Sequence, residues 1–190
     1  MKIKKLFIGN VWSEIKDIAL TTIGKSNIEN KEPDSNWKKR MLLAEHSPIR
    51  YLTIKWLWED IPYFVSVHFT RHKIGIEHFV KTQRTDRTNI NRNDLSQSNY
   101  VNHMCVANAQ AFINISKKRL CNQASTETRD AWNAVLTSFK DIEPELYNVC
   151  VPDCIYRGHC YEFKSCGYYK TDDFKRKLEK YRKGVNDNTW

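Results

Sequence analysis

The chain has 190 residues and a mass of 22.5 kDa, which is enough for one substantial hydrophobic core. Its hydrophobic content of 41%, with 12% aromatic residues, excludes wholesale disorder despite a mean hydropathy of −0.66. The formal net charge of +9 favours anionic partners such as nucleotides, phosphate-bearing cofactors, nucleic acid or acidic membrane surfaces, without choosing among them.

The N-terminus resembles the charged start of a secretory signal, because residues 1–5 are rich in lysine. Only residues 6–8 are apolar before Gly9-Asn10, which is too short for the hydrophobic part of such a signal. No run approaches the roughly 18 apolar residues of a membrane helix. We therefore expect a soluble, cytoplasmic protein that does not engage a membrane.

The first third of the chain predicts two helices. Residues 11–24 have apolar side chains at helical spacing, and residues 25–36 are a polar loop. Residues 37–45 predict a short helix that ends at Ser47-Pro48, since a residue before proline is pushed out of helical geometry.

Two strands are expected next. Residues 50–58 alternate and are rich in aromatic and β-branched side chains, and residues 63–69 repeat this pattern after a turn at residues 59–62. Residues 70–80 have no clear pattern. Residues 82–100 are polar and predict a mobile loop.

Helices dominate the remainder. Residues 101–120 carry apolar side chains that suit a long helix, and a second helix is expected from Ser125, as its N-cap, to about Phe139. The tail over residues 171–183 predicts a basic helix with Asp172-Asp173 in its first turn, where acidic side chains suit the helix dipole.

Six cysteines are present, and four of them cluster near the C-terminus. Cys150, Cys154, Cys160 and Cys166 are separated by three, five and five residues, which predicts a zinc knuckle in a reducing compartment, with His159 as a substitute ligand. The alternatives are an iron–sulfur cluster or thiols that fill space in a loop-rich segment. Cys105 and Cys121 are expected in the core of helices.

Three clusters of cationic and amide residues have spacings that suit phosphate-bearing ligands. They are Arg71-His72-Lys73, then Gln83-x-Thr85-x-Arg87, then Asn108-x5-Asn114-x4-Arg119. Arginine binds phosphate through two parallel hydrogen bonds and stays charged, so arginines from these three clusters could hold two phosphorylated ligands. Taken singly, each cluster is also typical of a solvated surface.

The order of these clusters resembles the flavin-dependent thymidylate synthase (ThyX) family, whose signature has the form R-H-R-x7-S-x-R. Here lysine replaces the third signature residue, and Thr85-x-Arg87 lies about four residues later than the family spacing. The segment 46–51 resembles the family's approach to the first strand. The stretch from Asn108 to Arg119 resembles its N-x5-N-x4-R helix, and Glu127-Thr128-Arg129 resembles the E-I-R continuation.

The resemblance covers residues 45–129 and implies an α/β (α+β) fold with a central, mostly antiparallel sheet flanked by helices. It divides the chain into a synthase-like domain, 1–145, and a Cys-rich extension with the basic helix, 146–190. It implies reductive methylation of dUMP with FAD as cofactor, NADPH and methylenetetrahydrofolate as co-substrates, and a homotetramer. The extension and the short segment between Arg87 and Asn108 suggest a phage or mobile-element version.

The resemblance also assigns roles to residues. Arg87 and Arg119 would be catalytic. The residues implied at the cofactor are Arg71, His72, Lys73, Asn108, Asn114 and Arg119. The residues implied at the substrate are His68, Gln83, Thr85, Arg87 and Arg119.

Two other functions fit the sequence. A related flavin enzyme could modify another pyrimidine nucleotide or a nucleic-acid base. A zinc-knuckle protein without catalysis could bind nucleic acid, with Trp56, Trp58, Tyr156 and Tyr161 stacking on bases. Bound flavin distinguishes the enzymes from the binding protein.

Overall fold

A four-stranded antiparallel sheet forms the centre of the molecule. The computed structural model describes residues 1–9, 11–26 and 30–186. The strands are β1 (Lys2–Ile8), β2 (Thr53–Pro62), β3 (Ile76–Val80) and β4 (Tyr100–Asn108), in the spatial order β1-β2-β4-β3. Every neighbouring pair is antiparallel, which confirms the expected sheet flanked by helices.

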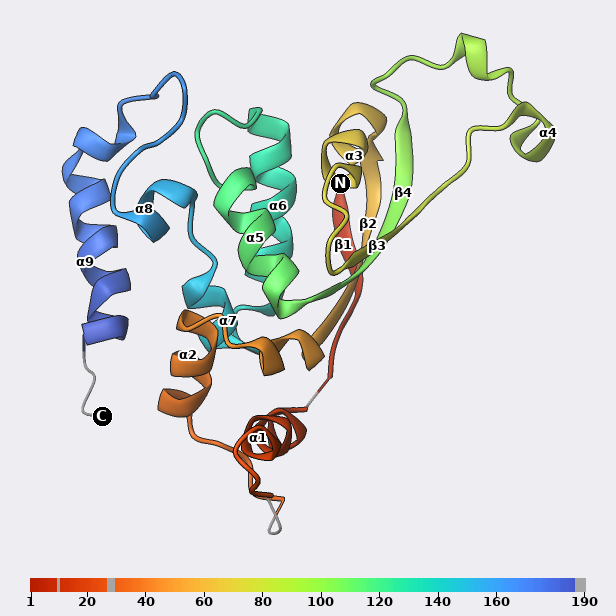
Figure 1. Ribbon diagram of the computed structural model, residues 1–190. Helices are drawn as coiled ribbons and strands as arrows, with labels where there is room; N and C mark the ends of the chain where they lie inside the picture. The colour runs from red at the N-terminus through yellow and green to blue at the C-terminus, as the bar shows by residue number, and fades with distance from the viewer. Residues whose placement is uncertain (10, 27–29, 187–190) are drawn as a thin grey trace.

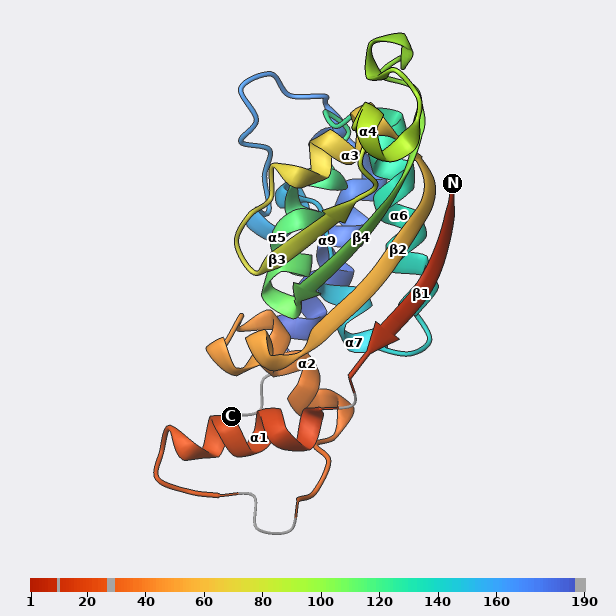
Figure 2. The ribbon, with the colours of Figure 1, turned by 90° about the vertical axis from the view of Figure 1, so that its right-hand side faces the viewer.

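Most of the helices lie on one face of this sheet, as Figures 1 and 2 show. Those of eight residues or more are α1 (Trp12–Thr21), α2 (Ser35–Leu43), α3 (Tyr63–Thr70), α5 (Ala109–Arg119), α6 (Thr126–Phe139) and α9 (Asp172–Asn186). The shorter ones are α4 (Thr85–Thr88), α7 (Pro144–Val149) and α8 (Asp153–Arg157), with 3-10 turns at Ser47–Tyr51, Arg92–Asp94 and Tyr168–Lys170.

Aromatic side chains fill the space between the sheet and these helices. Trp56 of β2 contacts Phe112 of α5 and Trp132 of α6 with ring centroids 5.1 and 5.9 Å apart. Trp58 is also fully buried, and its indole nitrogen donates to the Ala131 carbonyl at 3.1 Å. The hypothesis that Trp56 and Trp58 stack on nucleic-acid bases is therefore wrong, because both serve the core.

The segment 63–69, expected to be a strand, is helix α3. It buries Val65, Ser66 and Phe69, which share one face of a helix, whereas a strand would bury every second residue. The expected turn at residues 59–62 is the end of β2, with a register shift and a left-handed Asp60 (φ 58°). Tertiary packing favours the helix over the strand here, because the helix places the ring of Phe69 against Trp58, with the ring centroids 4.4 Å apart.

The long helix expected over residues 101–120 is two elements. Residues 100–108 form the central strand β4, which buries Val101, His103, Cys105 and Ala107 with a period of two. Only residues 109–119 form a helix, α5, which begins where the Asn108 side chain accepts a hydrogen bond from the Ala111 amide at 2.9 Å. Strands β1 and β3 lie in segments for which no helix or strand was predicted.

The other predicted helices are confirmed within a few residues. Helix α6 has Ser125 as its N-cap, and the Ser125 hydroxyl accepts from the Thr128 amide at 3.4 Å and contacts the Thr128 hydroxyl at 2.9 Å. Helix α9 has Asp172 and Asp173 in its first turn. The division of the chain after residue 145 stays a prediction.

Replacing Ser125 with alanine is expected to destabilise the protein by about 1 kcal/mol, because the first turn of α6 loses its side-chain acceptor. Chemical denaturation at equilibrium measures this change. Ser165→Ala in the C-terminal loop is the control, since that exposed hydroxyl accepts only from the nearby Gly167 amide. Equal losses in the two variants would contradict the capping role.

The second face of the sheet carries no helix of the described residues (Figure 2). Apolar side chains nevertheless point outward there, including Phe7 at 57% exposure and Phe79 at 58%. Met104, which is opposite Phe79 in the register, and Leu57 lie partly exposed on the same face. An apolar sheet face of this kind is typical of a surface that another chain covers.

Residues 81–99 form an arm that projects beyond the sheet (Figure 1). It contains α4 and the 3-10 turn Arg92–Asp94 where the sequence predicted only a loop. Backbone hydrogen bonds anchor both ends, from the Lys81 amide to the Asn102 carbonyl at 2.8 Å and from the Tyr63 amide to the Asn99 carbonyl at 2.9 Å.

None of the helices in the described part of the chain is both long and apolar enough to cross a membrane.

Candidate functional site

The turn that carries Arg71-His72-Lys73 joins α3 to β3, and His72 is held there at three points. Its amide donates to the Phe69 carbonyl at 2.9 Å, and its carbonyl accepts from Nε2 of His78 at 2.8 Å. Its ring Nε2 accepts from Nε of Arg119, at the end of α5, at 2.9 Å. Because arginine can only donate, His72 Nε2 carries no hydrogen.

Cationic and imidazole groups converge around Arg119. The guanidinium also donates to the His68 carbonyl, and the His68 ring lies 2.8 Å from the Thr128 hydroxyl of α6. Burial, and then the charge of Arg119, lowers the pKa of His72 to about 4. Burial and the charge of Arg71 lower the pKa of Arg119 itself. The structure thus places His72 and His68 in contact with Arg119, with the charge of Arg71 close by.

This cluster has an excess of positive charge. Among the described residues, no carboxylate forms an ion pair with Arg71, Lys73 or Arg119. Glu127 is the acidic side chain that acts on His68, where it opposes the lowering of the pKa by burial and by the two arginines. A half-buried arginine without a carboxylate partner, such as Arg119, beside the exposed Arg71 is typical of a site for a phosphate or another anion.

A buried network lies behind the turn. His103 and Cys105 of β4 face His78 of β3, with His78 Nδ1 2.9 Å from His103 Nε2 and Cys105 Sγ 3.2 Å from His103 Nε2. The Ser66 hydroxyl lies 3.0 Å from His103 Nδ1. Burial lowers the pKa of His103 to about 3 and raises that of Cys105, so both groups are neutral.

The positions of the hydrogens in this network can be deduced by starting from the His72 carbonyl. The His72 carbonyl can only accept, so His78 Nε2 carries a hydrogen. A single hydrogen on the neutral His103 ring, placed on Nε2, donates to His78 Nδ1 and leaves His103 Nδ1 to accept from the Ser66 hydroxyl. The ligand atoms of His78, His103 and Cys105 lie within 4.8 Å of one another and could hold a metal ion. Hydrogen bonds already satisfy both rings, so we assign the network to positioning His72.

The segment 71–75 runs along α5 from one end to the other. His72 contacts Arg119 at the end of α5, and Gly75 lies at its start, where the Gly75 carbonyl accepts from the Asn108 amide at 2.9 Å. Gly75 has φ +73°, and a Cβ there would lie 2.8 Å from the Asn108 side-chain amide, so glycine is required. Asn114 is exposed on α5 and lies outside this contact.

Gln83, Thr85 and Arg87 lie on or at the base of the arm rather than beside Arg119. The Thr85 hydroxyl accepts from the Arg92 amide at 3.3 Å, and the exposed Arg87 lies 3.8 Å from Asp86. The side-chain nitrogen of Gln83 is buried without a hydrogen-bond partner. The structure therefore separates the expected substrate residues into two groups within one chain.

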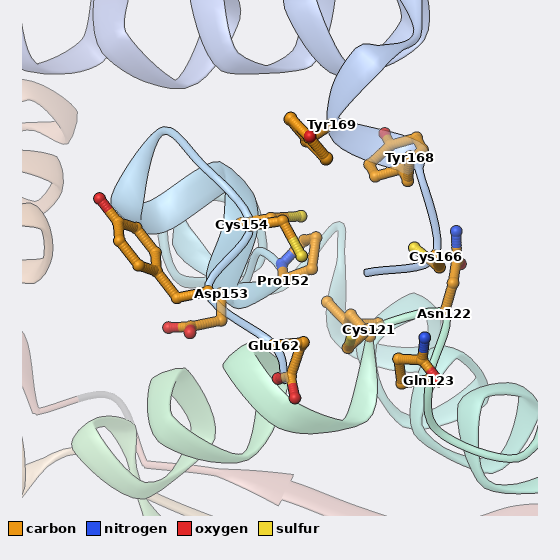
Figure 3. A pocket seen from close by; sticks show the side chains of 13 residues that line it. Cys121, Asn122, Gln123, Pro152, Asp153, Cys154, Glu162, Cys166, Tyr168 and Tyr169 are labelled. Atoms are coloured by element: carbon orange, nitrogen blue, oxygen red, sulfur yellow. The ribbon is translucent and has the colours of Figure 1, made fainter. Parts of the chain in front are cut away.

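The four cysteines of the expected knuckle are also divided. Cys154, Cys160 and Cys166 line one small cavity, and the fourth cysteine there is Cys121 (Figure 3). Cys150 is buried away from it. His159 packs its ring on Tyr161 and Tyr169 and does not line the cavity. Cys121, expected in a helix core, follows the end of α5 and is only half-buried.

A larger groove of about 820 Å³ separates α9 from α2, α6 and α7. Lysines and one arginine line it, namely Lys39, Arg129, Lys177, Lys180 and Lys183. Leu120, the residue after Arg119, also lines this groove.

Sequence reasoning missed Ser66, His78, His103 and Thr128. The alternation of residues 101–107 was the available signal for His103, since Val101, His103, Cys105 and Ala107 share one face of a strand. His78 and Ser66 become visible only when β3 and α3 pack against that strand.

No protein-family model and no curated protein matches the sequence. Solved structures match the fold. A flavin-dependent thymidylate synthase ThyX from Helicobacter pylori, complexed with FAD and dUMP, is 14% identical with a TM-score of 0.60, over 80% of this chain and 100% of that chain. A UMP/dUMP methylase PolB from Streptomyces cacaoi, bound with 5-Br dUMP, is 12% identical with a TM-score of 0.58, over 76% and 94%. With its antiparallel sheet and one-sided helices, the chain therefore has the fold of the flavin-dependent thymidylate synthases.

Proposed function

We propose that the chain is a flavin-dependent enzyme that methylates dUMP to dTMP, with FAD as cofactor and methylenetetrahydrofolate and NADPH as co-substrates. The contact that carries the proposal is the hydrogen bond from Arg119 to His72, since it joins two of the motifs that resemble the family in one electropositive site. The ligands of the two similar proteins, FAD with dUMP in one and 5-Br dUMP in the other, support this choice.

The residues present fit FAD and a nucleotide, which both bear phosphate. Among the described residues, no carboxylate pairs with the guanidinium groups of Arg71 and Arg119, and Lys73 adds a point charge at the same turn. The buried side-chain nitrogen of Gln83 has no hydrogen-bond partner in the described structure, so it could donate to a ligand. The absence of a side chain at Gly75 lets the backbone approach Asn108 closely at the start of α5.

The protein's own contribution to the reaction would be to hold and orient the ligands. Bound FAD supplies the redox chemistry. Arg119 and Arg71 would hold phosphate, and His72, neutral because of its low pKa, would keep its ring hydrogen on Nδ1 and present it to a ligand. The buried His78–His103–Ser66 network fixes the His72 carbonyl, so the turn is preorganised before a ligand arrives.

We propose a homotetramer in which the arm of one subunit completes the site of another. Two features support this arrangement. Gln83, Thr85 and Arg87 are displaced from Arg119 in their own chain, and the open face of the sheet exposes Phe7 and Phe79. Catalytic use of Arg87 together with Arg119 depends on this assembly.

An absorption spectrum of the purified protein, before and after addition of FAD, followed by titration with dUMP, tests the proposal. We expect flavin bands that shift when dUMP binds. Bands that shift with another pyrimidine nucleotide, and not with dUMP, would mean that the substrate is that other nucleotide. Failure to take up FAD would remove the enzyme proposal.

The nucleic-acid alternative retains one supporting observation, which is the lysine-lined groove beside α9. Tyr156 and Tyr161 are exposed, but cations already cover their rings, with Lys117 3.6 Å and Arg157 3.7 Å from the ring centroids. We therefore favour the nucleotide enzyme.

A further inference from the structure

Four thiols from three segments surround one cavity beside the end of α5. Cys121 follows that helix, Cys154 lies in the first turn of α8, and Cys160 and Cys166 lie in the loop between α8 and the 3-10 turn Tyr168–Lys170. Figure 3 shows Cys121, Cys154 and Cys166 around this space. All four are free thiols and none is fully buried.

Polar contacts hold the three segments together. The Gln123 side-chain amide donates to the Lys164 carbonyl at 2.8 Å, which ties the turn after α5 to the loop that carries Cys166. Lys118 lies 3.5 Å from Glu162 and 4.0 Å from Asp153, and so links α5 to the loop and to α8. The cysteines are therefore neighbours through a defined scaffold and not by the spacing of the sequence alone.

Backbone amides lie beside two of the thiols. The backbone amide of Gln123 lies near the sulfur of Cys121, and that of Ile155 lies near the sulfur of Cys154. Several ionised thiols in this space would repel one another unless a cation neutralises them.

We propose that Cys121, Cys154, Cys160 and Cys166 bind one zinc ion as a tetrahedral structural site. Four sulfur ligands select zinc or an iron–sulfur cluster, and a closed set of four is typical of structural zinc. Binding exchanges the thiol protons for the metal and releases them to solvent, which leaves a complex of net negative charge. Lys118 and Arg157 lie at the edge of the cavity, where they pair with Asp153 and Glu162.

The size of the cavity supports an ion over an organic ligand. Its volume is about 20 Å³, which is room for one water-sized group. Among the described residues, no three of these sulfurs lie within 4.8 Å of one another, whereas tetrahedral zinc sets sulfurs about 3.8 Å apart. Metal binding must therefore draw the loop inward, and Gly158 and Gly167, both with positive φ, flank the segment that moves.

Cys121 replaces Cys150 in the ligand set that the sequence predicted. Cys150 is buried in the core, where burial raises its pKa to about 12 and Ser116 is its hydrogen-bonding neighbour. The exchange has a functional consequence. Cys121 is two residues beyond Arg119, so a zinc ion there would fix the end of α5 that presents Arg119 to His72.

Metal analysis of the purified full-length protein tests this site independently of flavin or nucleotide binding. We expect about one zinc per chain in the wild type and a loss of at least about tenfold in Cys121→Ser and Cys166→Ser. Cys150→Ala is the matched control and is expected to retain its zinc. If Cys121→Ser keeps its zinc and Cys150→Ala loses it, the ligand set predicted from the sequence is correct and the proposal is overturned.

A second measurement uses only the wild-type chain, so it does not depend on folding of a variant. After removal of metal by a chelator, alkylation followed by peptide mass spectrometry is expected to modify Cys121, Cys154, Cys160 and Cys166. Added zinc is expected to protect all four together. Protection of none, disulfide formation in place of metal binding, or an iron–sulfur absorption spectrum would each overturn the zinc site.

Discussion

Replacing Arg119 with alanine is expected to weaken binding of FAD or dUMP by about 100-fold, or roughly 3 kcal/mol. Arg119 donates to His72 and to the His68 carbonyl, and these contacts fix the direction of its guanidinium. Its loss removes a charge that no carboxylate offsets among the described residues. Titrations monitored by flavin absorption and by calorimetry identify which of the two ligands Arg119 holds.

Two companion variants separate charge from geometry. Arg119→Lys keeps the charge and loses the planar fork, so about a tenfold loss is expected. Arg176→Ala removes an exposed arginine on α9 that pairs with Asp173, and no change is expected. In Arg119→Ala the pKa of His72 should also rise, because the charge of Arg119 lowers it. Unchanged affinities for both ligands would remove Arg119 from the site.

The residues of the basic cluster could be proposed from the sequence, because each belongs to a motif with a recognisable spacing. Arg71, His72 and Arg119 each belong to a motif, and the structure joins them through one hydrogen bond. The spacing could not reveal that His72 contacts the end of α5 while Gly75 contacts its start. That arrangement depends on the direction in which the segment 71–75 crosses α5, which packing determines.

The errors share one physical origin. Residues 63–70 and 100–108 both mix apolar and polar side chains over a short span, so helix and strand patterns compete. The sheet resolves the competition, since β4 pairs with β2 and β3 on its two sides and α3 places Phe69 on Trp58. Cys121 was missed for a related reason. It is distant in sequence from the other three cysteines and meets them only because α8 packs on α5.

Acid is expected to unfold the protein through its buried histidines. The pKa of His103 is about 3 and that of His72 about 4 in the folded chain, against an ordinary value of about 6.5. The unfolded chain therefore binds more protons below about pH 6.5, and the stabilisation present above that pH is lost as the pH falls towards the folded pKa values. For His103 alone the loss from about pH 7 to about pH 4.5 is about 2.5 kcal/mol.

The variant that isolates this contribution is His103→Leu, which fills a similar volume and does not titrate. It is expected to be less stable than the wild type at neutral pH, because Ser66 and His78 lose their partner. Its free energy of unfolding should nevertheless decline less between about pH 7 and about pH 4.5, by the share that His103 contributes in the wild type. Denaturation curves at both pH values measure this difference of differences, which also cancels the titration of carboxylates elsewhere. Parallel pH profiles for the two proteins would mean that a charged His103 is accommodated in the fold, and the neutral network behind His72 would then have to be abandoned.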